Sequence, residues 1–458
     1  MQYFSTRGAT PPKSFSDAVL TGLAPDGGLL LPEEFPRIDD KLARWRSLAF
    51  VDLAREVMQL FASDIPARDL NDLLAKSYAT FDDPEVVPLV EVADVVVMEL
   101  FHGPTLAFKD VALQFLGNLF ERLLAERATT MNVLCATSGD TGSAAIAGVK
   151  GKKGMRIFVL YPRGRVSRLQ ELQMTTVADA NVHCIAVDGS FDDCQSIMKK
   201  IFNDLAFKER YRLGATNSVN WARVLAQIVY YVYAALRLDR GGSTRVSFSV
   251  PTGNFGNILA GYLARKMGAP IDRLICATNE NDILSVFFNT GVYRRGDVHF
   301  TISPSMDIQV ASNFERFLYL HLGCDSARLR TFMQTFERTK EAQITNRAAL
   351  ATEFLATSVN TAQTMTTIRE VYERTHYVLD PHSATGIAAA HRFDVRGPVV
   401  CLATAHPAKF PESVDKAIGG PVARHPRLDR LSGLPSRVTE LPADIGEIQA
   451  FIRANASV

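Results

Sequence analysis

Short apolar runs alternate with helix-like segments through the middle of the chain, and this alternation is what most constrains the fold. Residues 95–100, 131–136, 156–160 and 245–250 each have the pattern of a buried strand. Loops rich in small residues follow the runs at 131–136 and 245–250, and helical periodicity follows each loop. Because parallel strands need crossover helices, the pattern predicts an α/β fold with a parallel sheet and helices on both faces.

A chain of 458 residues is long enough for two or three domains. The first part is rich in turns and then mostly helical, whereas the middle alternates strands and helices. The predicted order is an N-terminal domain (1–95), the first part of a large domain (96–130), a smaller α/β domain (131–215), and the second part of the large domain with a C-terminal extension (216–458).

Composition excludes several classes of function. The net charge of +1 favours neither nucleic acid nor an anionic membrane as a partner. The longest apolar region, residues 228–236, is far too short to span a bilayer. The six cysteines are dispersed, without C-x-x-C or H-E-x-x-H spacing, so we expect no metal site and a cytoplasmic protein with reduced thiols. A monomer and a homodimer remain equally compatible with the sequence.

One lysine, Lys109, lies inside an apolar segment at residues 101–110 (FHGPTLAFKD). Thr105 is the predicted N-cap of a helix, and apolar residues then recur at helical spacing. Burial near the start of that helix would lower the pKa of the lysine, and a neutral amine can attack a carbonyl to form a Schiff base. Alternatively, the lysine lays its stem on apolar surface and keeps its ammonium group in water.

Two loops at predicted strand ends offer anion-binding groups. Residues 252–257 (TGNFGN) contain glycines that allow a close backbone approach, and residues 137–142 (TSGDTG) add hydroxyl groups. Backbone N–H groups that precede a helix can bind a phosphate or a carboxylate. In open α/β sheets, ligands bind at such strand ends. The simpler alternatives are a tight turn for the first loop and a helix cap at Ser138 or Asp140 for the second.

An embedded lysine, two anion-binding turns and an α/β scaffold together favour pyridoxal phosphate as cofactor. Its aldehyde needs an amine, its phosphate needs a cradle, and its ring nitrogen needs a partner.

Motifs spread along most of the chain carry a family resemblance. They are STRG at 5–8, GLAPDGG at 22–28, FHGPTLAFKD at 101–110, TSGDTG at 137–142, NSVNWAR at 217–223, PTGNFGN at 251–257 and TAHPAKF at 404–410. In this order they resemble the microbial threonine synthases, a family of fold-type-II pyridoxal-phosphate enzymes. The resemblance implies two open, mostly parallel sheets with flanking helices, similar to tryptophan synthase β, plus an N-terminal helical unit.

The resemblance also implies roles for individual residues. Lys109 would form the Schiff base with pyridoxal 5'-phosphate, and Thr404 would be the partner of the pyridine nitrogen. The cofactor phosphate would be held by Gly253, Asn254, Phe255, Gly256 and Asn257. The wider fold type usually has asparagine where this chain has Asp140, although aspartate suits the microbial threonine synthases. An ionised Asp140 would repel a phenolate on the cofactor ring unless the carboxyl group is protonated or turned away.

The reaction that the resemblance implies converts O-phospho-L-homoserine and water to L-threonine and phosphate, by γ-elimination and β-addition. The expected contacts of the substrate carboxylate are Ser138, Gly139, Asp140 and Thr141. The expected contacts of the substrate phosphate are Arg165, Ser167, Ser218, Asn220 and Arg223. The closest alternative is a threonine-synthase-like phospho-lyase that eliminates phosphate from a related phosphorylated amino acid. A binding protein that keeps the fold without catalysis is disfavoured by the intact lysine and phosphate-loop motifs.

Overall fold

The larger of two main sheets forms the centre of the molecule. The computed structural model describes residues 1–137, 139–239, 241–345 and 348–457. The sheet has the order β13-β10-β9-β14-β4-β3, and every neighbouring pair is parallel except β3 and β4. Its strands are β3 (Leu89–Val92), β4 (Val95–Glu99), β9 (Val246–Pro251), β10 (Ile271–Thr278), β13 (Phe354–Ser358) and β14 (Val399–Ala403).

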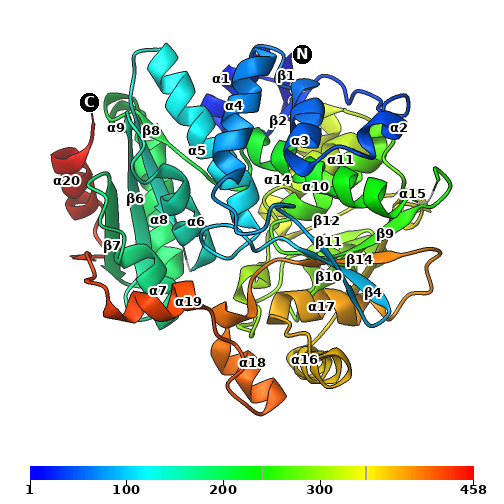
Figure 1. Cartoon of the computed structure of the whole chain (residues 1–458). Coiled ribbons are helices and arrows are strands. Elements are labelled where there is room, and N and C mark those ends of the chain that lie inside the picture. The colour runs from blue at the N-terminus through cyan, green and yellow to red at the C-terminus, as the bar shows by residue number, and fades with distance from the viewer. Residues whose placement is uncertain (138, 240, 346–347, 458) are drawn as a thin grey trace.

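Helices cover both faces of this sheet (Figure 1). On one face lie α5 (Lys109–Glu126), α10 (Trp221–Leu238) and α11 (Gly256–Met267), backed by the N-terminal helices α1 (Phe15–Thr21), α2 (Leu42–Trp45), α3 (Phe50–Gln59) and α4 (Ala67–Tyr78). On the other face lie α16 (Thr361–Thr375), α17 (Pro381–Ala390) and α18 (Pro411–Ile418). Within the described residues, no helix has the length and apolarity needed to cross a membrane.

The second sheet is wholly parallel, in the order β15-β7-β6-β5-β8. Its strands are β5 (Met131–Ala136), β6 (Met155–Pro162), β7 (Val182–Asp188), β8 (Leu213–Gly214) and β15 (Thr439–Pro442). The helices around it are α6 (Asp140–Val149), α7 (Arg168–Thr175), α8 (Phe191–Asn203), α9 (Leu205–Arg210) and α20 (Ile445–Asn455). The α/β fold with two mostly parallel sheets, predicted from the sequence, is confirmed.

Smaller elements complete the fold. Two antiparallel ribbons pair β1 (Tyr3–Ser5) with β2 (Leu30–Pro32), and β11 (Val292–Arg294) with β12 (Glu341–Gln343). The remaining helices are α12 (Ile283–Thr290), α13 (Phe314–His321), α14 (Ser326–Thr339), α15 (Ala348–Ala351) and α19 (Pro426–Asp429), with 3-10 turns at Pro304–Met306, Pro407–Lys409 and Arg430–Gly433.

The end of the chain differs from the prediction, which described residues 216–458 as the second part of the large domain with a C-terminal extension. The strand β15 pairs in parallel with β7, and α20 packs on α8, so both belong to the second sheet and its helices. Figure 1 shows this tail in red beside β6 and β7. The physical reason is that Ile448 and Ile452 of α20 are fully buried in the core of the second sheet. The sequence around α20 does not by itself indicate which sheet the helix packs on.

The helices α5 and α6 cross in close contact, and this crossing joins the two sheets. A Cβ atom added at Gly117 of α5 would lie 1.9 Å from the carbonyl oxygen of Gly148 of α6. A Cβ atom at Gly148 would lie 2.5 Å from the carbonyl oxygen of Leu113. Only glycine fits at both positions, because each contact is with backbone rather than with a flexible side chain. The crossing therefore fixes the helix that begins with Lys109 against the helix that begins with Asp140.

Gly117→Ala is expected to lower the free energy of unfolding by about 1–3 kcal/mol, the usual cost of overpacking. Gly433→Ala is the matched control, because nothing lies within 4 Å of a Cβ atom built there. Urea unfolding of both variants measures the difference. Equal midpoints for the two variants would show that the helices separate without cost.

Candidate active site

Two loops at neighbouring strand ends meet beside Lys109. The segment after β4 and the segment after β14 form a short antiparallel bridge at Ala107 and Ala405. Phe108 donates its N–H to the carbonyl of Thr404 at 2.8 Å. The segment that carries Lys109 and the segment that carries Thr404 are thus adjacent in the fold. Thr404 is buried at the carboxyl end of β14, as its position after an apolar strand predicted.

The start of the lysine helix differs from the prediction. Thr105 is not the N-cap, because α5 begins at Lys109 and is preceded by Phe108 without a side-chain cap. Instead, the N–H and the hydroxyl of Thr105 donate to the carboxylate of Asp110 at 2.7 and 2.8 Å. The loop between them is tight enough to place Leu106 in the left-handed region, at φ 60°. Asp110 therefore holds the loop against the first turn of the helix.

The amine of Lys109 is buried among charges. Its Nζ lies 3.8 Å from Oδ2 of Asp140 and donates to the hydroxyl of Ser305 at 3.4 Å. Burial lowers the pKa of Lys109 to about 8; the positive charges of Lys409 and Arg223 also lower the pKa, and the carboxylate of Asp140 opposes them. A substantial fraction of this amine is therefore neutral near physiological pH. Of the two interpretations of the lysine segment, burial is the one that the structure supports.

Asp140 forms a buried ion pair with Lys409, a residue that the sequence analysis did not identify. Nζ of Lys409 lies 2.9 Å from Oδ1 of Asp140 and donates to the carbonyl of Thr105 at 2.7 Å. Gln170 donates from Nε2 to the same carboxylate at 2.9 Å. Burial alone would raise the pKa of Asp140, but the ammonium groups of Lys409 and Lys109 outweigh it and hold the pKa well below its usual range. The carboxylate is thus ionised, and its charge is paired with that of Lys409.

The loop before α6 brings backbone N–H groups to the start of the helix. Thr137 accepts the N–H groups of Gly139 and Gly142 on its hydroxyl oxygen, each at 3.0 Å. The N–H groups of Asp140 and Thr141 lie in the first turn of α6, where backbone N–H groups have no acceptor within the helix. They are suited to a carboxylate at the helix N-terminus. Ser138, the other expected contact, lies outside the described residues.

The loop between β9 and α11 turns in a way that the sequence did not predict. Its left-handed residue is Phe255, at φ 65°, rather than a glycine. The ring of Phe255 is buried against Phe288 and other aromatic rings, and this packing offsets the strain of the backbone. Gly253 is required for a different reason, because a Cβ atom there would lie 2.5 Å from the carbonyl oxygen of Ser305. Gly256 begins α11 and has more space.

Asn257 presents an unpaired donor at the start of α11. Its Oδ1 accepts the hydroxyls of Tyr230 and Tyr231 at 2.5 and 2.9 Å. Its Nδ2 is buried and has no hydrogen-bond partner among the described residues. A buried amide without an acceptor is costly, so an anion such as a phosphate fits here together with the first-turn N–H groups. Asn254 has an exposed side chain, and its Oδ1 accepts the hydroxyl of Ser312 at 3.3 Å.

Arg223 and Ser218 lie close to this site. Arg223 is buried; it donates from Nη1 to the carbonyl of Thr216 at 3.0 Å, while its Nε has no partner in the described parts of the chain. Burial lowers its pKa to about 10, which still leaves the guanidinium charged at neutral pH. Ser218 shares a hydrogen bond of 2.9 Å with the hydroxyl of Ser312. A buried cation with a free N–H group is suited to a phosphate.

Asn220 does not present its side chain to a ligand, contrary to the expectation from the sequence. It is fully buried at the N-cap of α10, where its oxygen accepts the N–H of Ala222 at 3.1 Å. Its amide donates to the carbonyl of Val19 at 2.8 Å. Both ends are engaged, so Asn220 joins the helix to the N-terminal unit.

Arg165 and Ser167 lie in the loop between β6 and α7 and are exposed. The hydroxyl of Ser167 caps α7 by accepting the N–H of Gln170 at 3.3 Å. Through Gln170, this helix start is linked to Asp140. Their position near the rim of the site is compatible with a substrate contact.

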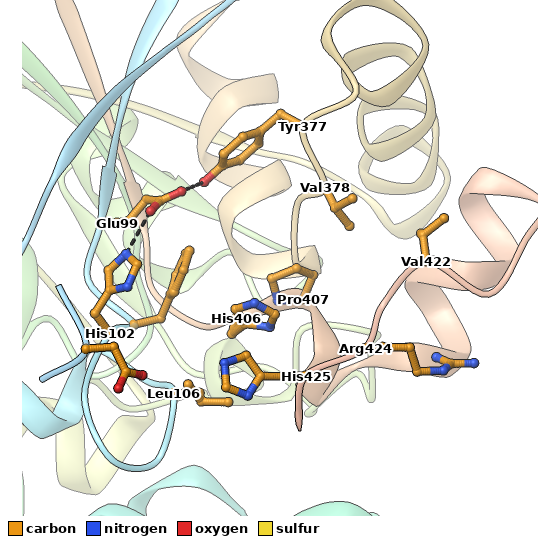
Figure 2. A pocket seen from close by; sticks show the side chains of 12 residues that line it. Glu99, His102, Leu106, Tyr377, Val378, His406, Pro407, Val422, Arg424 and His425 are labelled. Atoms are coloured by element: carbon orange, nitrogen blue, oxygen red, sulfur yellow. Dashed lines mark hydrogen bonds and ion pairs between the residues drawn. The ribbon is translucent and has the colours of Figure 1, made fainter. Parts of the chain in front are cut away.

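A separate cavity of about 430 Å³ lies on the other side of the lysine loop. Figure 2 shows Glu99 between His102 and Tyr377, at hydrogen-bond distances of 2.7 and 2.6 Å. Burial lowers the pKa of His406 to about 4, so this imidazole is neutral. The charge of Glu99 is paired within the wall, and Lys109 does not line this cavity.

The described residues contain no cluster of three or more side chains able to hold a metal ion.

Comparisons with known proteins bear on the whole chain. The family models that match are "Threonine synthase N terminus" at residues 2–78, "Pyridoxal-phosphate dependent enzyme" at 87–405 and "Threonine synthase, C-terminal" at 383–452. The threonine synthase of Corynebacterium glutamicum is 44% identical, with 100% of both chains covered. A crystal structure of pyridoxal-phosphate-bound threonine synthase from Brucella melitensis matches with a TM-score of 0.97, 44% identity and 100% of both chains covered. The human protein "Threonine synthase-like 2" is 39% identical, covering 90% of this chain and 88% of its own.

Acylation of the apoprotein should reveal the lowered pKa of Lys109. Well below pH 8 the amine is mostly protonated and unreactive, and its reactivity should rise with a midpoint near pH 8, the pKa set mainly by burial. An ordinary lysine has a pKa of about 10.4. Peptide mapping by mass spectrometry after brief exposure to an anhydride measures the midpoint, and Lys109→Ala confirms the modified peptide. A midpoint near 10 would contradict the assignment.

Proposed function

Because the chain belongs to the threonine synthase family of pyridoxal-phosphate-dependent enzymes, we propose that it converts O-phospho-L-homoserine and water to L-threonine and phosphate. The observation that carries this proposal is the buried amine of Lys109. This amine contacts Ser305, which packs on Gly253 of the loop proposed to hold the cofactor phosphate. The segment that carries the lysine also pairs with the segment that follows β14. The alternative, a related phospho-lyase, remains an outcome of the product test below.

The residues present fit the cofactor. Lys109 would hold the aldehyde carbon covalently, and Thr404 would meet the ring nitrogen. The loop Gly253–Asn257 would hold the phosphate, with the unpaired Nδ2 of Asn257 as a donor. When bound, pyridoxal phosphate supplies a carbonyl for the amine and an electron sink for a carbanion. A hydroxyl at Thr404 can donate to a neutral ring nitrogen but, unlike a carboxylate, does not favour its protonation.

Lys109 has the properties of the base for this reaction. Its neutral amine would be able to take the proton from the substrate Cα, and later to move protons at Cβ. The paired charges of Asp140 and Lys409 are fixed beside it and keep the local field constant while the proton moves. Phosphate leaves from Cγ, and water adds at Cβ.

The two anionic groups of the substrate have separate partners in this proposal. The carboxylate would bind at the N-terminus of α6, on the N–H groups of Asp140 and Thr141 and next to Gly139. Ser138, the other expected contact, lies outside the described residues. The phosphate lies near Arg223 and Ser218, and Arg165 and Ser167 approach it from the rim. Arg223 is the strongest of these candidates, because its Nε is buried and free among the described residues.

We further infer a cytoplasmic protein that acts as a monomer or a homodimer. All six cysteines are free thiols, as a reducing compartment requires. Light scattering of the purified protein decides between the two oligomeric states.

Purified enzyme supplied with O-phospho-L-homoserine should form threonine and phosphate in equal amounts. Threonine is measured by amino-acid analysis and phosphate by a colorimetric assay of the same sample. Lys109→Ala should form neither product above background, because it has neither the attachment point nor the base. Release of phosphate without threonine would support the phospho-lyase instead.

Thr404→Val tests the partner of the ring nitrogen. The substitution is nearly isosteric and leaves the backbone bond to Phe108 in place. Loss of one hydrogen bond to a neutral group costs on the order of 1 kcal/mol or more, which predicts a roughly tenfold lower kcat. The absorbance of the protein-bound cofactor should remain, as its attachment is to Lys109. Unchanged kinetics would show that Thr404 only ends the strand.

A further inference from the structure

Ser305 lies in a segment that no sequence motif marked, and it touches two parts of the site at once. Its hydroxyl accepts an N–H from Nζ of Lys109 at 3.4 Å. Its carbonyl oxygen packs so closely on the loop after β9 that a Cβ atom at Gly253 would lie 2.5 Å away. One residue therefore contacts both the amine and the loop proposed to hold the cofactor phosphate.

A buried histidine and aspartate support Ser305 from behind. The N–H of Ser305 donates to Nε2 of His382 at 3.2 Å, and Nδ1 of His382 lies 2.8 Å from Oδ1 of Asp380. Because Nε2 accepts a hydrogen bond, the proton of the neutral imidazole must be on Nδ1, facing Asp380. His382 and Asp380 are 2% and 1% exposed, so neither has a solvent-facing role.

Asp380 is itself held firmly. It caps α17 by accepting the N–H groups of His382 and Ser383 at 2.9 and 3.2 Å, and its second oxygen accepts the hydroxyl of Ser383. The other side of the segment is fixed through Asp307, which accepts the amide of Asn279 at 2.7 Å. The backbone around Ser305 is thus anchored at both ends, from α17 and from the end of β10.

We propose that Ser305 is a catalytic residue that orients the amine of Lys109, and that His382 positions Ser305. A primary amine rotates freely about its Cε–Nζ bond, and its lone pair must face the proton that it removes. A hydrogen bond from one N–H to a fixed hydroxyl restricts that rotation, which is a known source of rate. The inference deepens the proposed function and rests on the assignment of Lys109 as the base.

Ser305→Ala tests the orienting bond in the complete enzyme. We expect kcat to fall about tenfold, the effect of one lost hydrogen bond, with KM within about twofold. The substitution leaves the backbone contacts to His382 and Gly253 intact, so the variant should retain pyridoxal phosphate. Thr331→Ala, which removes an exposed hydroxyl on α14, is the control and should behave as the wild type.

The apoprotein gives a readout that does not depend on substrate. A hydroxyl that accepts an N–H stabilises the ammonium form, so its loss should move the acylation midpoint of Lys109 to lower pH. The charged groups that face this amine are Asp140, Lys409, Arg223 and Asp110, and none of them is altered by the substitution. A role of Ser305 that is merely structural would leave the midpoint in place.

Two substitutions of His382 separate its two contacts. In His382→Asn, the amide can still donate to Asp380, but nothing accepts the N–H of Ser305. In His382→Gln, the amide oxygen reaches the position of Nε2, and the bond to Asp380 is lost. If His382 acts through Ser305, the Asn variant should reproduce the lower kcat and the shifted midpoint, and the Gln variant should stay within about threefold of the wild type.

Each experiment has a result that would overturn the role assigned to Ser305 or to His382. A Ser305→Ala enzyme with wild-type kcat and an unchanged acylation midpoint overturns the proposal. A folded His382→Asn enzyme that matches the wild type overturns the positioning role, and if that variant fails to fold, the Ser305→Ala arms still decide the role of Ser305. Should the wild type release phosphate without threonine, the proposed function fails, whereas the apoprotein midpoint still tests the Ser305 contact.

Discussion

The buried ion pair between Asp140 and Lys409 is the interaction on which the site depends. Asp140 opens α6, beside the second sheet, and Lys409 follows β14 of the large sheet, so the pair joins the two halves of the molecule. Removing one member of a buried pair typically costs about 3–5 kcal/mol, because the other charge is left without compensation. The pair also sets the environment of Lys109, since Asp140 favours its charged form and Lys409 opposes it.

The close packing of two glycines fixes the positions of Lys109 and Asp140 relative to each other. The contact of Gly117 with Gly148 fixes α5 against α6, and the lysine and the aspartate are the first residues of those helices. A shift of one helix would change the distance of 3.8 Å between Nζ of Lys109 and Asp140. A contact between two backbones cannot adjust as a flexible side chain can. The crossing therefore restricts how far the buried amine of Lys109 can move relative to Asp140.

The site draws on strand ends that are far apart in sequence. Lys109 follows β4, the loop Gly253–Asn257 follows β9, Asn279 follows β10, and Thr404 follows β14. These strands are neighbours in the order β10-β9-β14-β4, so their carboxyl ends meet along one edge. The parallel sheet is what converts separate motifs into one site, in keeping with the general location of ligands in open α/β sheets.

The sequence by itself determined the α/β fold and predicted the lysine segment and the two loops at strand ends, because strand periodicity, small residues and helix starts are local properties of a chain. It did not reveal Lys409, Ser305 or His382, since each acts through a partner that is distant in sequence. It also misplaced the N-cap at Thr105. In the loop between β9 and α11, it attributed the turn to glycine, whereas the left-handed residue is Phe255. Only the tertiary structure decided that the amine of Lys109 is buried and that Asp140 is paired, because desolvation and ion pairing depend on what the rest of the chain packs around a residue.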